Sequence, residues 1–171
     1  NAYYIITPPA ASTDSQVERL VAVAKAIGSI PMVLDYKEHD FITAAVSHLP
    51  HVIASSLVNL VKDSDNEEEM MKRLAAGGFK DITRIASSSP EMWEQICMTN
   101  RENLAVILER YIASLNQILG EVKGGDKTAF HELFETSRDY RNSISERAKG
   151  SVSPDYFFTV DVVDEPGSIS T

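Results

Sequence analysis

One stretch of this sequence, residues 101–122, is patterned more regularly than any other. Apolar residues recur there in steps of 4, 3, 4, 3 and 4, at Leu104, Leu108, Tyr111, Leu115, Ile118 and Val122. That spacing is typical of a helix that packs lengthwise against another helix. Further apolar residues at Ile107, Ile112 and Leu119 widen the stripe. We therefore expect this helix to be covered on more than one side, and a second copy of the chain is our hypothesis for the partner.

The whole of residues 37–149 lacks a convincing strand signal and is predicted to be helical. Along residues 37–62 one helical stripe is apolar, and Pro50 interrupts it, so we expect a kink. Residues 63–69 are predicted to form a solvated loop that enters a short helix, which ends at the glycine pair 77–78. Two further helices are expected after Ser89 and over residues 127–149.

The two ends of the chain differ from this middle. Residues 1–35 are predicted to form a strand, a helix and a strand, with Asp14 capping the helix and Gly28 ending it. Residues 150–154 are expected to be a linker, and residues 156–163 alternate like a strand. We predict a mainly α fold with a βαβ remnant in front and a truncated strand behind, divided as 1–36, 37–149 and 150–171. Because the first residue is Asn1, the chain is expected to be cut from something longer.

Charge and composition exclude several classes of function. The formal net charge is −9 and no four basic residues cluster, so we expect no nucleic-acid partner. No uninterrupted apolar run reaches the ~18 residues that a membrane span needs, and no secretory leader is evident. The single cysteine, Cys97, cannot form an internal disulfide, which favours a reducing, cytoplasmic location and a role as a small core residue.

The common catalytic and cofactor motifs are absent from the sequence. It contains no GxGxxG, Walker loop, CxxC, HExxH or GxSxG, and no Glu-x-x-His pair. The chain by itself therefore lacks the usual means of holding a dinucleotide or activating a nucleophile. We predict no cofactor-binding residue and no metal site within it.

A polar stripe on the helix around Pro50 is the first candidate site. Its members are spaced four apart: His39, Thr43, Ser47, His51 and Ser55. On a regular helix they share one face, opposite the apolar stripe. The functional interpretation is that His51, with His39, donates hydrogen bonds to an anionic or hydroxylated ligand. Solvated or internally paired histidines remain the alternative; a metal held by His48 and His51 lacks a third ligand.

A second candidate site follows in the sequence GGFKDITR, residues 77–84. Gly77 and Gly78 would let the backbone approach a ligand, and Asp81 could cap the next turn. Lys80 and Arg84 lie four apart and could face one pocket, where arginine can hold a carboxylate with two hydrogen bonds. The alternative is a helix end with a surface lysine and an Arg84–Asp81 pair. Trp93 is interpreted as a core residue or as a flat pocket wall, and both interpretations stay open.

The two segments together, HDFITAAVSHLPH (39–51) and GGFKDITRIASSSPEMW (77–93), resemble the prephenate dehydrogenase family of tyrosine biosynthesis. The resemblance extends over nearly the whole chain. It implies the end of a nucleotide-binding domain in residues 1–35, a helical dimerisation domain in 37–149, and the start of an ACT regulatory domain in 156–171.

What the resemblance implies is oxidative decarboxylation of prephenate to 4-hydroxyphenylpyruvate with NAD or NADP. Arg84 would bind a substrate carboxylate, His51 would line the pocket, and Gly77 and Gly78 would allow close approach. Lys80, Asp81 and Trp93 would support that site, and the stripe adds His39 and Ser47 to the prediction.

The family's catalytic histidine and its glycine-rich loop belong to the nucleotide domain and are not in this sequence. We therefore expect no turnover from this chain alone, a homodimer as the assembly, and tyrosine as a possible regulator. The competing hypothesis is a helical dimerisation or ligand-sensing module without chemistry of its own.

Overall fold

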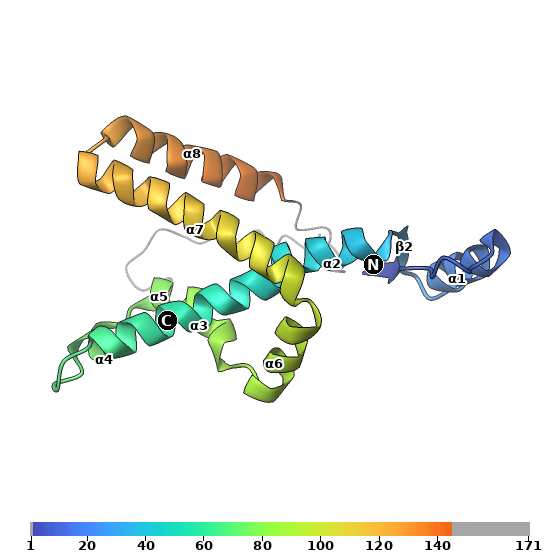
Figure 1. Ribbon diagram of the computed structural model, residues 1–171, viewed down its shortest axis with the longest axis horizontal. Coiled ribbons are helices and arrows are strands. Elements are labelled where there is room, and N and C mark those ends of the chain that lie inside the picture. The colour runs from blue at the N-terminus through green and yellow to red at the C-terminus, as the bar shows by residue number, and fades with distance from the viewer. Residues whose placement is uncertain (1, 145–171) are drawn as a thin grey trace, which may run out of the picture.

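A computed structural model describes residues 2–144 of the chain (Figure 1). The predictions for residues 150–171, a linker and the start of an ACT domain, lie outside the described residues. The first unit is the predicted βαβ: β1 (Tyr3–Ile6), α1 (Asp14–Ala26) and β2 (Ile30–Val33). The strands are parallel, with Tyr3 opposite Ile30 and Ile6 opposite Val33.

Helix α1 shows local capping at both ends. Thr13, not Asp14, is the N-cap, and the Thr13 amide donates to Gln16 Oε1 at 2.9 Å. The sequence prediction was therefore one residue late. Gly28 follows the helix with a φ of +78°, a left-handed conformation that glycine adopts without strain, so its predicted role as the terminator is confirmed.

Everything from Tyr36 to Ser143 that is regular is helical, which confirms the mainly α prediction for the described residues. One continuous helix runs through α2 (Tyr36–Thr43), a π-helical turn η1 (Ala44–His48) and α3 (Leu49–Ser64). It is followed by α4 (Met70–Leu74), α5 (Gly77–Thr83), a 3₁₀ turn η2 (Arg84–Ser87), α6 (Pro90–Thr99), α7 (Arg101–Gly124) and α8 (Lys127–Ser143).

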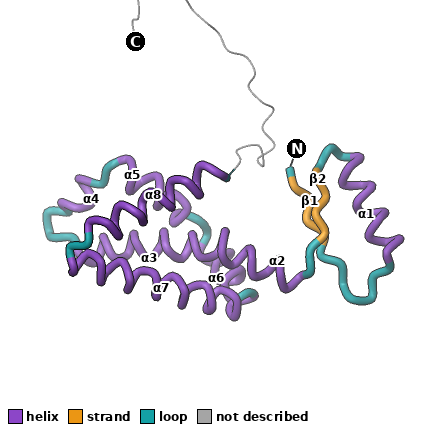
Figure 2. Tube along the Cα trace, turned by 90° about the horizontal axis from the view of Figure 1, so that it is seen from above, coloured by secondary structure: helices purple, strands orange, loops and turns teal. Residues whose placement is uncertain are grey.

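The helices pack around α3 and α7. Figures 1 and 2 show α8 folded back along α7, α4 and α5 returning beside α3, and the βαβ unit standing apart at the far end of α2. The N-terminal part of α7 contacts α2, η1 and α3. The buried apolar residues of this helical part are small or central to that crossing: Ala44, Ala54, Leu104 and Ile107. The alanines let the helix backbones approach closely.

Two sequence predictions about the loops need correction. The short helix α4 ends at Leu74, and the glycine pair begins α5 instead of ending the helix before it. Asp81 lies inside α5 and caps nothing. The residue that does organise this region is Asp65, whose carboxylate accepts the backbone N–H groups of Asn66, Met71 and Lys72. Those hydrogen bonds, with the charge of Lys72, outweigh desolvation and hold the Asp65 pKa below its usual value.

The continuous helix Tyr36–Ser64 also has the length and hydropathy of a membrane-spanning helix, which the sequence pattern did not suggest. It is 29 residues long, and its most apolar window has a mean hydropathy of 1.5, so by length and composition alone it could cross a membrane. An uninterrupted apolar run was missing because Thr43, Ser47, His48 and His51 divide it. Core helices of soluble proteins satisfy the same criterion when they are mostly buried; here 11% of the window is buried within residues 2–144, and the helix contacts α4, α5, η2 and α7.

Candidate functional site

The π-helical turn η1 ends at His48, two residues before Pro50. The Leu49 amide donates to the carbonyl of Ala44, five residues back, instead of to a carbonyl four residues back. Pro50 has no N–H, and its ring would collide with the carbonyl four residues before it in a regular helix. The widened turn accommodates the proline without ending the helix. The kink expected at Pro50 is therefore expressed as a π turn, a feature that is frequent at functional sites.

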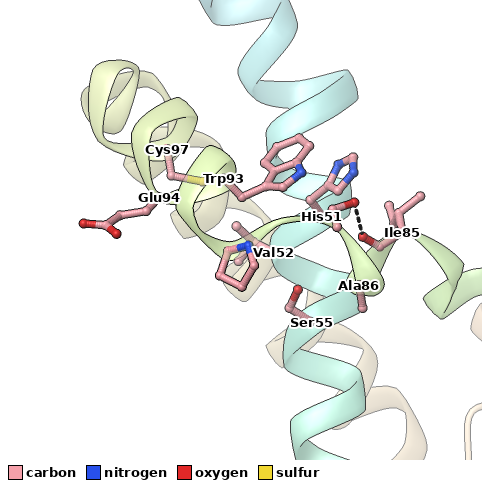
Figure 3. A pocket seen from close by; sticks show the side chains of 10 residues that line it. His51, Val52, Ser55, Ile85, Ala86, Trp93, Glu94 and Cys97 are labelled. Atoms are coloured by element: carbon pink, nitrogen blue, oxygen red, sulfur yellow. Dashed lines mark hydrogen bonds between the residues drawn. The ribbon is translucent and has the colours of Figure 1, made fainter.

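The histidine after this turn stacks on the chain's single tryptophan. The ring centroids of His51 (α3) and Trp93 (α6) are 3.5 Å apart with an interplanar angle of 23°. Figure 3 shows the two rings meeting across the gap between the helices, with η2 closing the other side. They form one wall of a hollow of about 400 Å³. Its lining residues are His51, Val52, Ser55, Ile85, Ala86, Ser88, Pro90, Trp93, Glu94 and Cys97.

The hydrogen bond from the His51 side chain to the helix backbone shows which ring nitrogen carries the hydrogen. Nδ1 of His51 lies 3.0 Å from the backbone carbonyl of Ser47, which can only accept, so Nδ1 carries a hydrogen. The neutral ring therefore has its lone pair on Nε2, the nitrogen turned away from the helix backbone. A neutral His51 accepts a hydrogen bond from a hydroxyl, and a protonated His51 donates one to a carboxylate. The side chain suits both kinds of ligand group that the sequence predicted.

The neighbouring His48 is assigned the opposite tautomer. Its Nδ1 lies 3.4 Å from the side-chain amide of Asn100, and its ring meets Trp93 edge-on at 6.2 Å. Burial, together with the nearby His51, lowers the pKa of His48 below the usual 6.5. His48 is therefore kept neutral near pH 7 and supports the ring of Trp93.

Two further polar groups belong to this wall. The indole N–H of Trp93 is buried and has no hydrogen-bond partner within residues 2–144. Cys97 lines the hollow and is half-buried, so it does not lie in the fully buried core as predicted. Burial raises the pKa of its thiol, which keeps it protonated and unreactive near neutral pH.

The predicted five-residue polar stripe does not form one surface of the hollow. His39 and Thr43 precede the π turn η1, and neither lines the hollow. His39 instead lies with Nδ1 3.0 Å from the Asp40 carboxylate, and Thr43 donates to the His39 carbonyl. Ser47 contributes its carbonyl to His51, while His51 and Ser55 line the hollow together.

None of residues 77–84, the second predicted segment, lines the hollow. Arg84 begins η2, directly before the lining residue Ile85, and is exposed. It makes no ion pair within residues 2–144, so the alternative pairing with Asp81 is not formed. Lys80 and Asp81 are exposed on α5. The guanidinium of Arg84 is thus available to a partner from outside the described chain.

Gly77 and Gly78 form the first turn of α5 with ordinary φ angles. A Cβ built on either glycine would meet no atom within 4 Å, so nothing in the described chain requires glycine there. The space above them is open. A close approach by a ligand or another chain would account for the pair.

Sequence analysis missed several residues of this site. Glu94 and Ser88 line the hollow, and Asn100 touches His48. Glu94 could have been found, because it follows the predicted wall residue Trp93. Asn100 carried no signal, since its partner Asp40 lies 60 positions away in the sequence.

Comparison with known proteins places this chain in a family. The sequence profile described as "Prephenate dehydrogenase, dimerization domain" matches residues 35–136. Prephenate dehydrogenase from Bacillus subtilis (strain 168) is 39% identical over 170 residues, which cover 99% of this chain and 46% of that protein. The chain belongs to the prephenate dehydrogenase family.

Two further relatives of the prephenate dehydrogenase family support the assignment. Prephenate dehydrogenase from Lactococcus lactis subsp. cremoris (strain MG1363) is 34% identical over 169 residues, or 99% of this chain and 46% of its own length. A crystal structure of prephenate dehydrogenase from A. aeolicus, in complex with hydroxyphenyl propionate and NAD+, superposes with a TM-score of 0.78 at 29% identity. That match covers 84% of this chain and 50% of the other.

The chain thus spans about half the length of the prephenate dehydrogenases it matches. The connection from β1 to α1 contains Pro8 and Pro9 and no glycine, so it cannot form a phosphate-binding glycine loop. Within residues 2–144 there is also no group of three or more His, Cys, Asp or Glu side chains placed to hold a metal ion.

Proposed function

We propose that the full-length protein containing this chain is an NAD- or NADP-dependent prephenate dehydrogenase of tyrosine biosynthesis. It would convert prephenate to 4-hydroxyphenylpyruvate by oxidation and loss of carbon dioxide. The observation that carries the proposal is the His51–Trp93 wall, because both residues come from the two segments that mark the family. The glycine-rich cofactor loop of the family is expected outside this sequence, so only the substrate is considered further.

The chemistry of the substrate matches the groups around the hollow. Prephenate carries two carboxylates and a ring hydroxyl, so its site needs cations and hydrogen-bond donors. Arg84 is unpaired within residues 2–144 and can hold a carboxylate with two parallel hydrogen bonds. His51 offers Nε2, and the ring of Trp93 offers a flat apolar surface for a six-membered ring.

The other predicted site residues take supporting positions in this proposal. Gly77 and Gly78 leave open space beside α5, and Lys80 adds a second exposed cation on that helix. Asp81 is exposed on α5. Ser47 acts through its carbonyl, which accepts a hydrogen bond from His51. His39 pairs with the carboxylate of Asp40 and would influence the electrostatic potential near the π turn.

The assembly that we propose is a homodimer. Apolar residues of α7 remain exposed on the face that α8 does not cover, and the matched family is described by its dimerization domain. We also propose a cytoplasmic location without membrane insertion, as expected of a biosynthetic enzyme. Domain limits at 1–36, 37–149 and 150–171, and regulation by tyrosine through residues 150–171, remain predictions.

In the test, the full-length protein is incubated with prephenate and NAD or NADP, and turnover is measured as the formation of the reduced cofactor. Arg84→Ala should raise KM by roughly 10- to 100-fold, the range expected when hydrogen bonds to a charged group are lost. Arg84→Lys should recover only part of this, because lysine cannot bind a carboxylate with a planar fork. Arg73→Ala, an exposed arginine on α4, is the matched control and should leave KM unchanged.

His51→Ala should also raise KM, by about tenfold, with the fold intact by circular dichroism. The exposed His131 on α8 gives the matched control His131→Ala. Wild-type protein without NAD(P)-dependent turnover would contradict the proposal and favour the ligand-sensing module. Unchanged kinetics in Arg84→Ala would remove Arg84 from the site while leaving the function standing.

A further inference from the structure

Asn100 occupies the junction between the pocket helix α6 and the long helix α7. Its side chain is half-buried and makes three contacts: Nδ2 to the carbonyl of Asp40 at 2.7 Å, Nδ2 to His48 Nδ1 at 3.4 Å, and Oδ1 to Asn103 Nδ2 at 2.8 Å. The residue ends α6 and precedes α7, yet its side chain caps neither helix. Its amide is instead directed at the helix that contains the π turn.

The chemistry of the partners fixes how this amide is oriented. The Asp40 carbonyl can only accept a hydrogen bond, so the group facing it must be the NH₂ of Asn100. The opposite orientation would place Oδ1 against a carbonyl oxygen. The second amide hydrogen then faces His48 Nδ1, which must be an acceptor. Asn100 thereby selects the His48 tautomer with its hydrogen on Nε2.

The carbonyl that Asn100 contacts lies at the entrance to the π turn. The Ala44 amide, at the first residue of the π turn, is shared between the carbonyls of Asp40 and Phe41, four and three residues back. A shared donor leaves the Asp40 carbonyl with unused accepting capacity. Thr43 Oγ1 and Asn100 Nδ2 supply the further donors, at 3.1 and 2.7 Å.

A continuous chain of contacts leads from this point to the hollow. The His48 ring meets Trp93 edge-on, and Trp93 stacks on His51 at 3.5 Å. His51 in turn donates to the Ser47 carbonyl inside the π turn. Asn100 therefore contacts two parts of this chain of contacts. One is the entrance to the turn that orients His51, and the other is the histidine that supports Trp93.

We propose that Asn100 is a positioning residue, which secures the π turn and the His48 tautomer and so holds the His51–Trp93 wall in place for the substrate. The inference rests on the proposed function for what the wall binds, but its structural part does not. The titratable groups that bear on His48 are Asp40 and His39 from α2 and His51 from α3. A neutral His48 that accepts from Asn100 agrees with the depressed pKa that burial and His51 impose.

The decisive variant is Asn100→Asp in the full-length protein, since it keeps the size and removes both N–H donors. The new carboxylate repels the Asp40 carbonyl and favours protonated His48. In ¹⁵N-histidine NMR spectra without substrate, we expect the His48 pKa to rise and the neutral Nε2–H signature to disappear. The matched control is Thr99→Ala at the same junction, because Thr99 Oγ1 bonds only within α6, to the carbonyls of Gln95 and Ile96.

The kinetic arm measures prephenate KM and kcat across pH. Asn100→Asp should raise KM by about tenfold, a typical consequence of one lost hydrogen bond, with a smaller change in kcat. Its KM should recover partly at pH values low enough to protonate the new carboxyl, which can then donate. Thr99→Ala should behave as wild type in both arms.

Three outcomes separate the possibilities. An unchanged His48 signature in folded Asn100→Asp would overturn the positioning role, whatever the kinetics. A changed signature in a protein whose wild type does not turn over prephenate would support the positioning of the wall and reject the proposed function. If Asn100→Asp does not fold, Asn103→Asp replaces it: this change draws the Asn100 amide hydrogens towards residue 103, and an unaltered His48 spectrum would then overturn the inference.

Discussion

The two halves of helix α7 carry the same kind of apolar residue but bury it to different extents. In the first half, Leu104 and Ile107 are 8% and 9% exposed, where the helix crosses α2, η1 and α3. In the second half, Ile112, Leu115, Leu119 and Val122 are 45–55% exposed, and within residues 2–144 α8 is the helix that packs alongside. One helix therefore completes its own core at one end and leaves an apolar face uncovered at the other.

The difference separates the part of the stripe that packs within one protomer from the part that stays exposed there. Exposed apolar side chains that recur on one helix face mark an interaction surface more clearly than scattered ones do. The pocket lies at the covered end, where α3, α6 and η2 converge. We infer that the chain orders its binding wall by itself and depends on a second copy for the α7 arm.

The largest effect is expected from Leu115→Glu combined with Leu119→Glu. If the uncovered face is the dimer interface, each copy would have to bury two unpaired carboxylates, which costs several kcal/mol per charge. The mass of the full-length protein at micromolar concentration should fall from dimer to monomer in size exclusion with light scattering. The control is Ala113→Glu, because Ala113 is exposed on a different face of the same helix, and this variant should stay dimeric. A dimer that survives the double change would remove the Leu115 face from the interface.

Leu104→Ala probes the covered half. Deleting a buried leucine side chain should cost about 2–5 kcal/mol of unfolding free energy, because transfer and cavity terms add. Urea unfolding of the monomeric double variant described above provides the measurement. In that background Ile112→Ala should cost less than about 1 kcal/mol, since the side chain is already half exposed. Equal costs at the two positions would abolish the distinction between the halves.

The smallest effect concerns pH at the pocket end. Because the folded pKa of His48 lies below 6.5, the unfolded chain binds this proton more tightly than the folded chain. The stability is complete above the unfolded pKa and decreases as the pH falls through the folded pKa. Urea midpoints measured between about pH 7.5 and 5 should show this slope, and His48→Gln should flatten it. His131→Gln, on the exposed α8 surface, should not; a flattening there would show that the slope is not specific to His48.

Much of the fold was accessible to pattern reasoning because it depends on local periodicity. The βαβ unit, the Gly28 terminator and the α7 stripe were all predicted from residues within a few turns of each other. The site was less accessible. His51 and Trp93 were named separately, but their stacking joins helices 42 positions apart in the chain, and no spacing rule describes that contact.

The polar stripe shows where periodicity fails. Counting at four residues per step assumes a regular helix from His39 to Ser55, and Pro50 was expected only to bend it. The structure instead contains a π turn at Ala44–His48, and His51 and Ser55 line the hollow while His39 does not. A single extra residue in one turn is invisible to a pattern that averages over the helix.

The sequence by itself therefore determined the helices, the apolar faces and membership in the prephenate dehydrogenase family, because these depend on residue type and local spacing. Only the tertiary structure decided the stacking of His51 on Trp93 and the tautomer of His48. These features depend on hydrogen bonds and packing between distant segments, of which the contact from Asn100 to the Asp40 carbonyl is the clearest example. Such contacts are selected by the folded arrangement as a whole, since no local segment contains both partners.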